Sequence, residues 1–81
     1  MNRYVVRLFA RYAELFGAEQ VEVQLPANSN VADLIIALRA LPGGASLPAV
    51  PFVAVNLAQA GASTRLNAAD EVALLPPLAG G

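Results

Sequence analysis

The stretch NVADLIIALRAL, residues 30–41, predicts the one long helix of this chain. Its apolar positions 31, 34, 35, 38 and 41 fall on a single helix face. Asn30 suits the N-cap, and Asp33 at the third helical position places a carboxylate at the positive end of the helix dipole. Pro42-Gly43-Gly44 follows the helix instead of opening one, so we interpret it as a stop signal, not as a phosphate-binding loop.

Strands are predicted on both sides of this helix. Residues 3–10 alternate with the period of a half-buried strand, with Tyr4, Val6 and Leu8 on one face and Arg3, Val5, Arg7 and Phe9 on the other. Residues 21–25 alternate in the same way and stop at Pro26. The valine-rich residues 52–56 indicate a buried strand, and residues 71–75 indicate the last one.

The connections complete the expected architecture. Residues 11–16 suit a short helix closed by Gly17, which joins the first two strands. Residues 42–50 form a loop, 57–64 are compatible with a short strand or a turn, and 66–70 with a tight turn. This order predicts an α+β, β-grasp (ubiquitin-like) fold over residues 1–75. One main helix packs across one face of a mixed sheet, which leaves the other face available to a partner.

The sequence closes on Pro76-Pro77-Leu78-Ala79-Gly80-Gly81. Proline fixes φ and keeps the preceding residue extended, whereas Gly80 and Gly81 have no Cβ and fit a narrow channel. Six extended residues reach about 20 Å. A frayed terminus is the simple alternative, but this segment carries no charged side chain. We therefore expect residues 76–81 to form a flexible arm that presents a carboxylate.

Composition excludes most other chemistry. The 81 residues include no Cys, His or Lys, so thiol nucleophiles, imidazole bases, Schiff bases and the usual zinc ligands are absent. The five cations are all arginine and the net charge is −1, which offers no basic stripe for nucleic acid. If this protein takes part in a reaction, we expect its reactive group to be the carboxylate of Gly81.

The chain is unusually apolar for its length. Hydrophobic residues make up 57% of it, and its mean hydropathy is +0.54. So small a domain cannot bury all of this surface, which favours a protein interface over the alternative that the excess of alanine reflects genome base composition. No segment approaches the ~20 apolar residues of a membrane span, and no signal peptide is evident at the N-terminus. We expect a cytoplasmic protein that does not bind membranes.

Four segments together resemble the small subunit of molybdopterin synthase. Residues 8–17, LFARYAELFG, resemble the F-A-x-x-R-E-L-x-G opening of that family, and residues 30–34 resemble its T-V-x-x-L helix start. Residues 54–56 match its A-V-N strand, and residues 70–81 match its D-E-V-A…P-P-V-S/T-G-G ending. This chain departs from the family at Ala13, Asn30, Ala69 and Leu78-Ala79. Of these, Ala69 replaces a glycine that often supplies positive φ, so the local turn can differ.

The resemblance implies a mechanism in which this chain carries sulfur. A separate adenylating enzyme uses ATP to activate the C-terminal glycine, here Gly81, and sulfur from a persulfide donor protein displaces AMP to leave a thiocarboxylate. The arm then enters the large catalytic subunit, where the thiocarboxylate attacks a cyclic pyranopterin monophosphate, and two rounds build a dithiolene. This chain itself binds no cofactor or metal and supplies no catalytic side chain.

The expected roles differ between the arm and the domain. Gly81 carries the sulfur, and Gly80 allows passage through a channel. Pro76 and Pro77 stiffen the base of the arm, with Leu78 beyond them as a further partner contact. Phe9 and Leu75 match apolar positions that the family presents to its large subunit, and core packing is the alternative for both.

Other functions remain open at the level of the sequence. Sulfur carriers for thiamine, amino acid synthesis or tRNA thiolation share the fold and the Gly-Gly ending. A ubiquitin-like modifier would join the same activated glycine to lysines of target proteins. The sequence does not distinguish these pathways with certainty, and it does not identify the activating enzyme, the sulfur donor or the oligomeric state.

Overall fold

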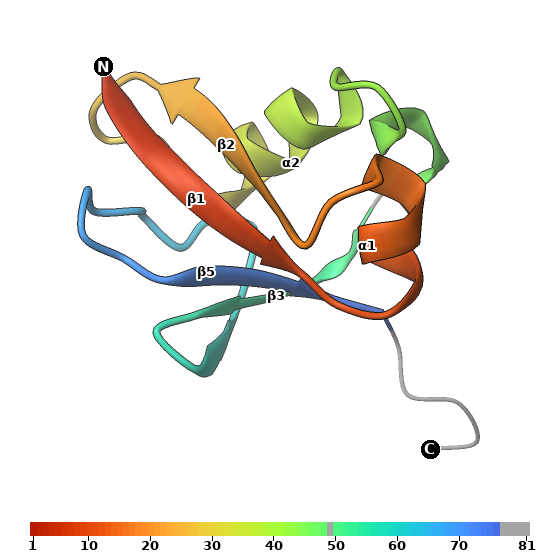
Figure 1. The fold of residues 1–81 in the computed structure, drawn as a ribbon. Coiled ribbons are helices and arrows are strands. Elements are labelled where there is room, and N and C mark those ends of the chain that lie inside the picture. The colour runs from red at the N-terminus through yellow and green to blue at the C-terminus, as the bar shows by residue number, and fades with distance from the viewer. Residues whose placement is uncertain (49, 77–81) are drawn as a thin grey trace.

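Five strands form one mixed sheet in the order β2-β1-β5-β3-β4, and α2 crosses one face of it (Figure 1). This computed structural model describes residues 1–48 and 50–76. Its elements are β1 (Asn2–Leu8), α1 (Arg11–Phe16), β2 (Gln20–Leu25), α2 (Val31–Arg39), the 3₁₀ turn η1 (Gly44–Ser46), β3 (Phe52–Val55), β4 (Ala58–Ala60) and β5 (Val72–Leu75). The predicted β-grasp fold is confirmed.

The central pair of strands, β1 and β5, is parallel, and the other pairs are antiparallel. β1 pairs with β2 across α1, as expected, and β3 lies between β5 and the edge strand β4. The short strand β4 resolves the ambiguous segment 57–64. Because β5 runs beside β1 and ends at Leu75, the chain leaves the sheet next to the end of β1.

The core lies between α2 and the inner face of the sheet. On β1 the residues Tyr4, Val6 and Leu8 are buried, as their alternation predicted. Burial of the predicted helix face is likewise confirmed for all its members within α2, which are Val31, Leu34, Ile35 and Leu38. The helix ends at Arg39, two residues earlier than predicted. Leu41 still packs against the core, from the turn in which its amide donates to the Leu38 carbonyl at 3.1 Å.

Helix α2 begins with a reciprocal capping box. The Asp33 amide donates to Asn30 Oδ1 at 3.0 Å, and the Asn30 amide donates to Asp33 Oδ2 at 3.0 Å. Each side chain therefore satisfies a backbone group that has no partner within the helix. The departure from threonine at position 30 leaves the cap intact, because asparagine is an equally good N-cap.

Removing this cap gives the first testable expectation. Asn30→Ala should destabilise the domain by about 1 kcal/mol, which corresponds to a fall in Tm of roughly 4–8 °C for a domain of this size. Thermal denaturation followed by circular dichroism measures the change. Asn30→Ser is the matched control and should keep a Tm near that of the parent. An equal loss in both variants would contradict capping as the cause.

The turn before β5 is held by side chains instead of by a glycine. Asp70 Oδ2 accepts from the Asn67 amide at 2.7 Å, and Asp70 Oδ1 accepts from Asn56 Nδ2 at 2.9 Å. Ala69 is not among the described residues that have positive φ, whereas Asn56, which bonds to Asp70, is one of them. Alanine therefore replaces the family's glycine without backbone strain, and Asp70 has a structural role.

Candidate functional site

The predicted arm falls largely outside the described residues. Pro77, Leu78, Gly80 and Gly81 all lie in the segment 77–81, so their roles stay predictions. Pro76 is the last described residue, half-buried and directly after β5. The site that the structure does describe is therefore the surface from which this segment departs.

The two predicted interface residues are brought together on the outer face of the sheet. Leu75 is half-buried at the end of β5, and the Phe9 amide donates to the carbonyl of the neighbouring Leu74 at 3.3 Å. Phe9 is 40% exposed, so its interpretation as a core residue is wrong. The predicted strand 3–10 was too long, because β1 ends at Leu8 and Ala10 turns to φ 52° ahead of α1.

Phe52 is a third member of this group, and sequence reasoning missed it. It pairs in register with Leu75 and is 43% exposed. The neighbouring Val53 points inward, so alternation along β3 turns Phe52 to the outer face. That alternation was present in the sequence, but the neighbour of β3 in the sheet was not evident from it. We call Phe9, Phe52 and Leu75 the apolar cluster.

A shallow hollow of about 360 Å³ extends from the apolar cluster along the outer face. Its floor includes the small residues Ala54 and Ala73, which face each other across β3 and β5. A partner can approach the sheet closely where side chains are this small. The residues that line the hollow are Arg7, Phe9, Phe52, Ala54, Leu57, Gln59, Glu71, Ala73 and Leu75.

The charged groups of the outer face lie mainly on β1 and β2. Arg3 Nε and Glu22 Oε1 are 3.6 Å apart, but both side chains are more than half exposed, so this pair contributes little to stability. The Arg7 guanidinium lies 5.7 Å from the centre of the Phe9 ring, within the range of a cation–π interaction. The apolar cluster is therefore bounded by one cation on the β1 side.

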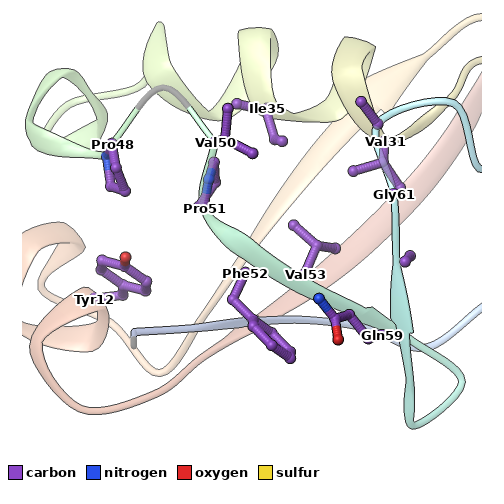
Figure 2. Close-up of a pocket in the computed structure, with 12 residues that line it drawn as sticks. Tyr12, Val31, Ile35, Pro48, Val50, Pro51, Phe52, Val53, Gln59 and Gly61 are labelled. Carbon is purple, nitrogen blue, oxygen red and sulfur yellow. The ribbon is translucent and has the colours of Figure 1, made fainter. Parts of the chain in front are cut away.

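A second cleft, of about 470 Å³, lies between α2, the loop before β3 and the edge strand β4. In Figure 2, Val31 and Ile35 lie on the helix and Val53 points towards them, while the ring of Phe52 points away. None of the side chains that line this cleft is charged. The polar side chains in the described lining of this cleft are those of Tyr12 and Gln59 (Figure 2).

Within residues 1–48 and 50–76, no three potential metal ligands gather in one place. None of the helices in these ranges is both long and apolar enough to span a bilayer. The feature that these residues do form is an exposed apolar cluster beside the point where the chain leaves β5.

A five-stranded mixed sheet crossed by one main helix defines the class, the ubiquitin-like β-grasp proteins. The model of the ThiS family matches residues 6–81. A molybdopterin synthase sulfur carrier subunit from Dictyostelium discoideum is 30% identical, over 99% of this chain and 98% of the relative. The chain therefore belongs to the ThiS family and is a ubiquitin-like sulfur carrier.

Two solved structures illustrate how widely this fold is used. SAMP1 from Haloferax volcanii, a small archaeal modifier protein, superposes with a TM-score of 0.83 and 28% identity, covering 99% of this chain and 100% of that one. The second is one chain of a complex of subunits 1 and 2 of the molybdopterin-converting factor from Helicobacter pylori. It superposes with a TM-score of 0.70 and 24% identity, and the match covers 98% of this chain and 99% of that one. The second likeness concerns the fold alone.

Proposed function

We propose that this chain is the sulfur-carrying small subunit of a molybdopterin synthase. The observation that carries the proposal is its match to the Dictyostelium discoideum sulfur carrier subunit, which extends over nearly the full length of both proteins. The family match supports it, because it runs through residue 81 and so includes the terminal Gly80-Gly81 pair.

The chemistry follows from the poor reactivity of a carboxylate. An oxygen of the Gly81 carboxylate attacks ATP on an adenylating enzyme, which forms an acyl adenylate and releases pyrophosphate. The terminal sulfur of a donor persulfide then attacks the acyl carbon, and AMP leaves. A thiol cleaves the resulting sulfur–sulfur bond by thiol–disulfide exchange, so that the sulfur stays on Gly81 as a thiocarboxylate and the donor retains a disulfide. The large subunit uses this thiocarboxylate to build the dithiolene.

The outer sheet face is the proposed docking surface for the large subunit. Phe9, Phe52 and Leu75 are partly exposed, and Leu75 directly precedes Pro76. A partner that covers this apolar cluster holds Pro76 close to its own surface. The residues after Pro76 then lose less entropy when they enter the partner's active site. The Helicobacter pylori protein of the same fold was solved in complex with the other subunit of its molybdopterin-converting factor, which is a precedent for such a partner.

The test is to co-express the chain with an adenylating enzyme, a sulfur donor and a large subunit. Intact-mass spectrometry should find a fraction in which one oxygen has been replaced by sulfur, and fragmentation should place the change at Gly81. The thiocarboxylated protein should then convert cyclic pyranopterin monophosphate with the large subunit. A thiocarboxylate that supports thiamine synthesis or tRNA thiolation, but not this conversion, would retain the carrier role and overturn the pathway.

The likeness to SAMP1 favours a second candidate function, that of a protein modifier. In that case the activated Gly81 would form an amide with a lysine of a target protein. The chain has no lysine of its own and so could not be an acceptor at a side chain. Recovery of Gly81 joined to lysines of other proteins, without any sulfur transfer to the pyranopterin, would favour the modifier.

Docking can be tested separately from the chemistry. Phe9→Ala should weaken binding to the large subunit by roughly thirtyfold, since buried anchors often contribute above 2 kcal/mol. Isothermal titration calorimetry measures the affinity, and a melting curve checks the fold. Ile36→Ala is the matched control, because Ile36 is 68% exposed on α2, in the layer on the opposite side of the sheet. Equal affinities for the two variants would contradict docking at the apolar cluster.

A further inference from the structure

The turn between β3 and β4 contains one residue that the fold does not explain. Both of its central residues have positive φ, 52° at Asn56 and 70° at Leu57. Two-residue hairpin turns of this kind strongly prefer Asn followed by Gly, because glycine adopts positive φ without strain. Leucine therefore occupies the position at which glycine is preferred.

Asn56 is accounted for by its hydrogen bonds. Its Nδ2 donates to Asp70 Oδ1 at 2.9 Å, and its Oδ1 accepts from the Glu71 amide at 2.9 Å. Its own amide also donates to the Glu71 carbonyl at 2.8 Å. These bonds tie the hairpin to the start of β5, so the left-handed conformation of Asn56 serves the packing of the sheet.

Leu57 has no comparable role. Its side chain is 89% exposed, so it contributes almost no apolar burial, and its backbone is in a conformation that leucine rarely adopts. The residue is thus unfavourable in two ways in the isolated domain. A strained, exposed apolar residue is a reason to look for a function at that position.

The position of Leu57 suggests what that function is. It lines the same hollow as Phe52 and Leu75, so it belongs to the outer face of the sheet. Phe52 and Val55 are the two ends of β3, roughly 10 Å apart at 3.3 Å per residue, and Leu57 lies just beyond Val55. Between the apolar cluster and Leu57 the floor is formed by Ala54 and Ala73. The surface is therefore low in the middle and carries apolar side chains at both ends, with the polar side chains of Gln59 and Glu71 also in its lining.

We propose that Leu57 is a second anchor for the large subunit, inserted into an apolar depression on that partner; this inference rests on the proposed function. The hollow is continuous from the apolar cluster to Leu57, so a partner seated on one end extends naturally to the other. A single anchor leaves the partner free to pivot about it. Two anchors at opposite ends of β3 set its orientation, which determines the direction in which residues after Pro76 enter its active site.

Leu57→Gly tests this proposal without risk to the fold. Relief of the backbone strain should raise Tm by roughly 4–8 °C, while loss of the side chain should weaken binding to the large subunit about tenfold or more. Leu57→Asn, which also tolerates positive φ, should weaken binding similarly. Affinity is measured by calorimetry with the purified large subunit, with Ile36→Ala as the control.

The outcomes separate this inference from the proposed function. A higher Tm with unchanged affinity in Leu57→Gly, alongside weakened binding in Phe9→Ala, would overturn the second anchor and retain the docking surface. Unchanged affinity in both variants would overturn the docking surface itself. A second copy of this chain is the alternative occupant. It would be indicated if the parent chain dimerises in sedimentation experiments and Leu57→Gly abolishes the dimer without changing the affinity for the large subunit. In that case the proposal fails. The proposal would also be overturned if Leu57→Gly weakened binding to the adenylating enzyme but not to the large subunit.

Discussion

Removal of Gly81, or addition of one residue after it, is expected to abolish sulfur transfer while the domain stays folded. Each change moves the reactive carbon by about 3.3 Å along an extended chain. Displacements near 1 Å can already lower the rate roughly a hundredfold, so neither variant should present its carboxyl carbon in a productive position. Because the core lies within the sheet and α2, Tm should hardly change.

Formation of the thiocarboxylate and transfer of its sulfur can both be measured on the same preparations. Intact-mass spectrometry reports whether a thiocarboxylate forms, and single-turnover conversion of the pyranopterin reports whether it is transferred. One extra residue before Met1, which is 83% exposed, is the matched control and should leave both steps unchanged. Normal conversion by the chain that lacks Gly81 would rule out the terminal carboxylate as the sulfur-carrying group.

The largest effect on stability is expected for Gly44→Ala. A Cβ at this position would lie 2.8 Å from the carbonyl carbon of Leu38 and 2.9 Å from Arg39 Cα, and closer still to the Leu38 oxygen. These are backbone atoms of α2 and cannot rotate away. We expect a destabilisation of about 3 kcal/mol or more, which corresponds to a fall in Tm of at least roughly 12 °C.

Gly61→Ala is the matched control for this loss. A Cβ at Gly61 would meet nothing within 4 Å, and its φ is not positive. Replacing glycine at such a site reduces the entropy of the unfolded chain, so the variant should be as stable as the parent or more stable by about 0.4–1 kcal/mol. Urea unfolding of the two variants compares them directly. Similar stabilities would mean that η1 can move away from α2.

Local patterns in the sequence were sufficient for most of the secondary structure. Asn30 and Asp33 lie three residues apart, so their capping box forms within one turn of helix and needs no distant partner. The alternation of β1 likewise predicts its buried face, because successive side chains of any strand point to opposite sides. Gly17 ends α1 with φ 70°, a conformation that glycine adopts without strain. These features depend on neighbours along the chain.

The role of Gly43-Gly44 shows where local reasoning stops. The prediction that this pair ends the helix is confirmed, because the pair follows α2. Its second role depends on contacts with elements distant along the chain: a Cβ at Gly43 would lie 3.0 Å from the Leu15 carbonyl carbon, at the end of α1. The sequence pattern does not reveal which backbone will pass so close.

The residues of the candidate site likewise fall into those that the sequence predicted and those that it did not. Resemblance and composition indicated Gly81 as the reactive terminus and Phe9 and Leu75 as contacts, whereas Phe52 and Leu57 emerged only from the sheet. Phe52 joins the cluster because β3 pairs with β5 in one particular register, and Leu57 because the hairpin tip turns onto the outer face. Strand order and register are set by burial summed over the whole sheet, to which each residue contributes only a small part. Patterns along the chain therefore predicted most of the helices and strands and their buried faces, whereas the pairing of the strands in three dimensions sets which exposed side chains share a surface.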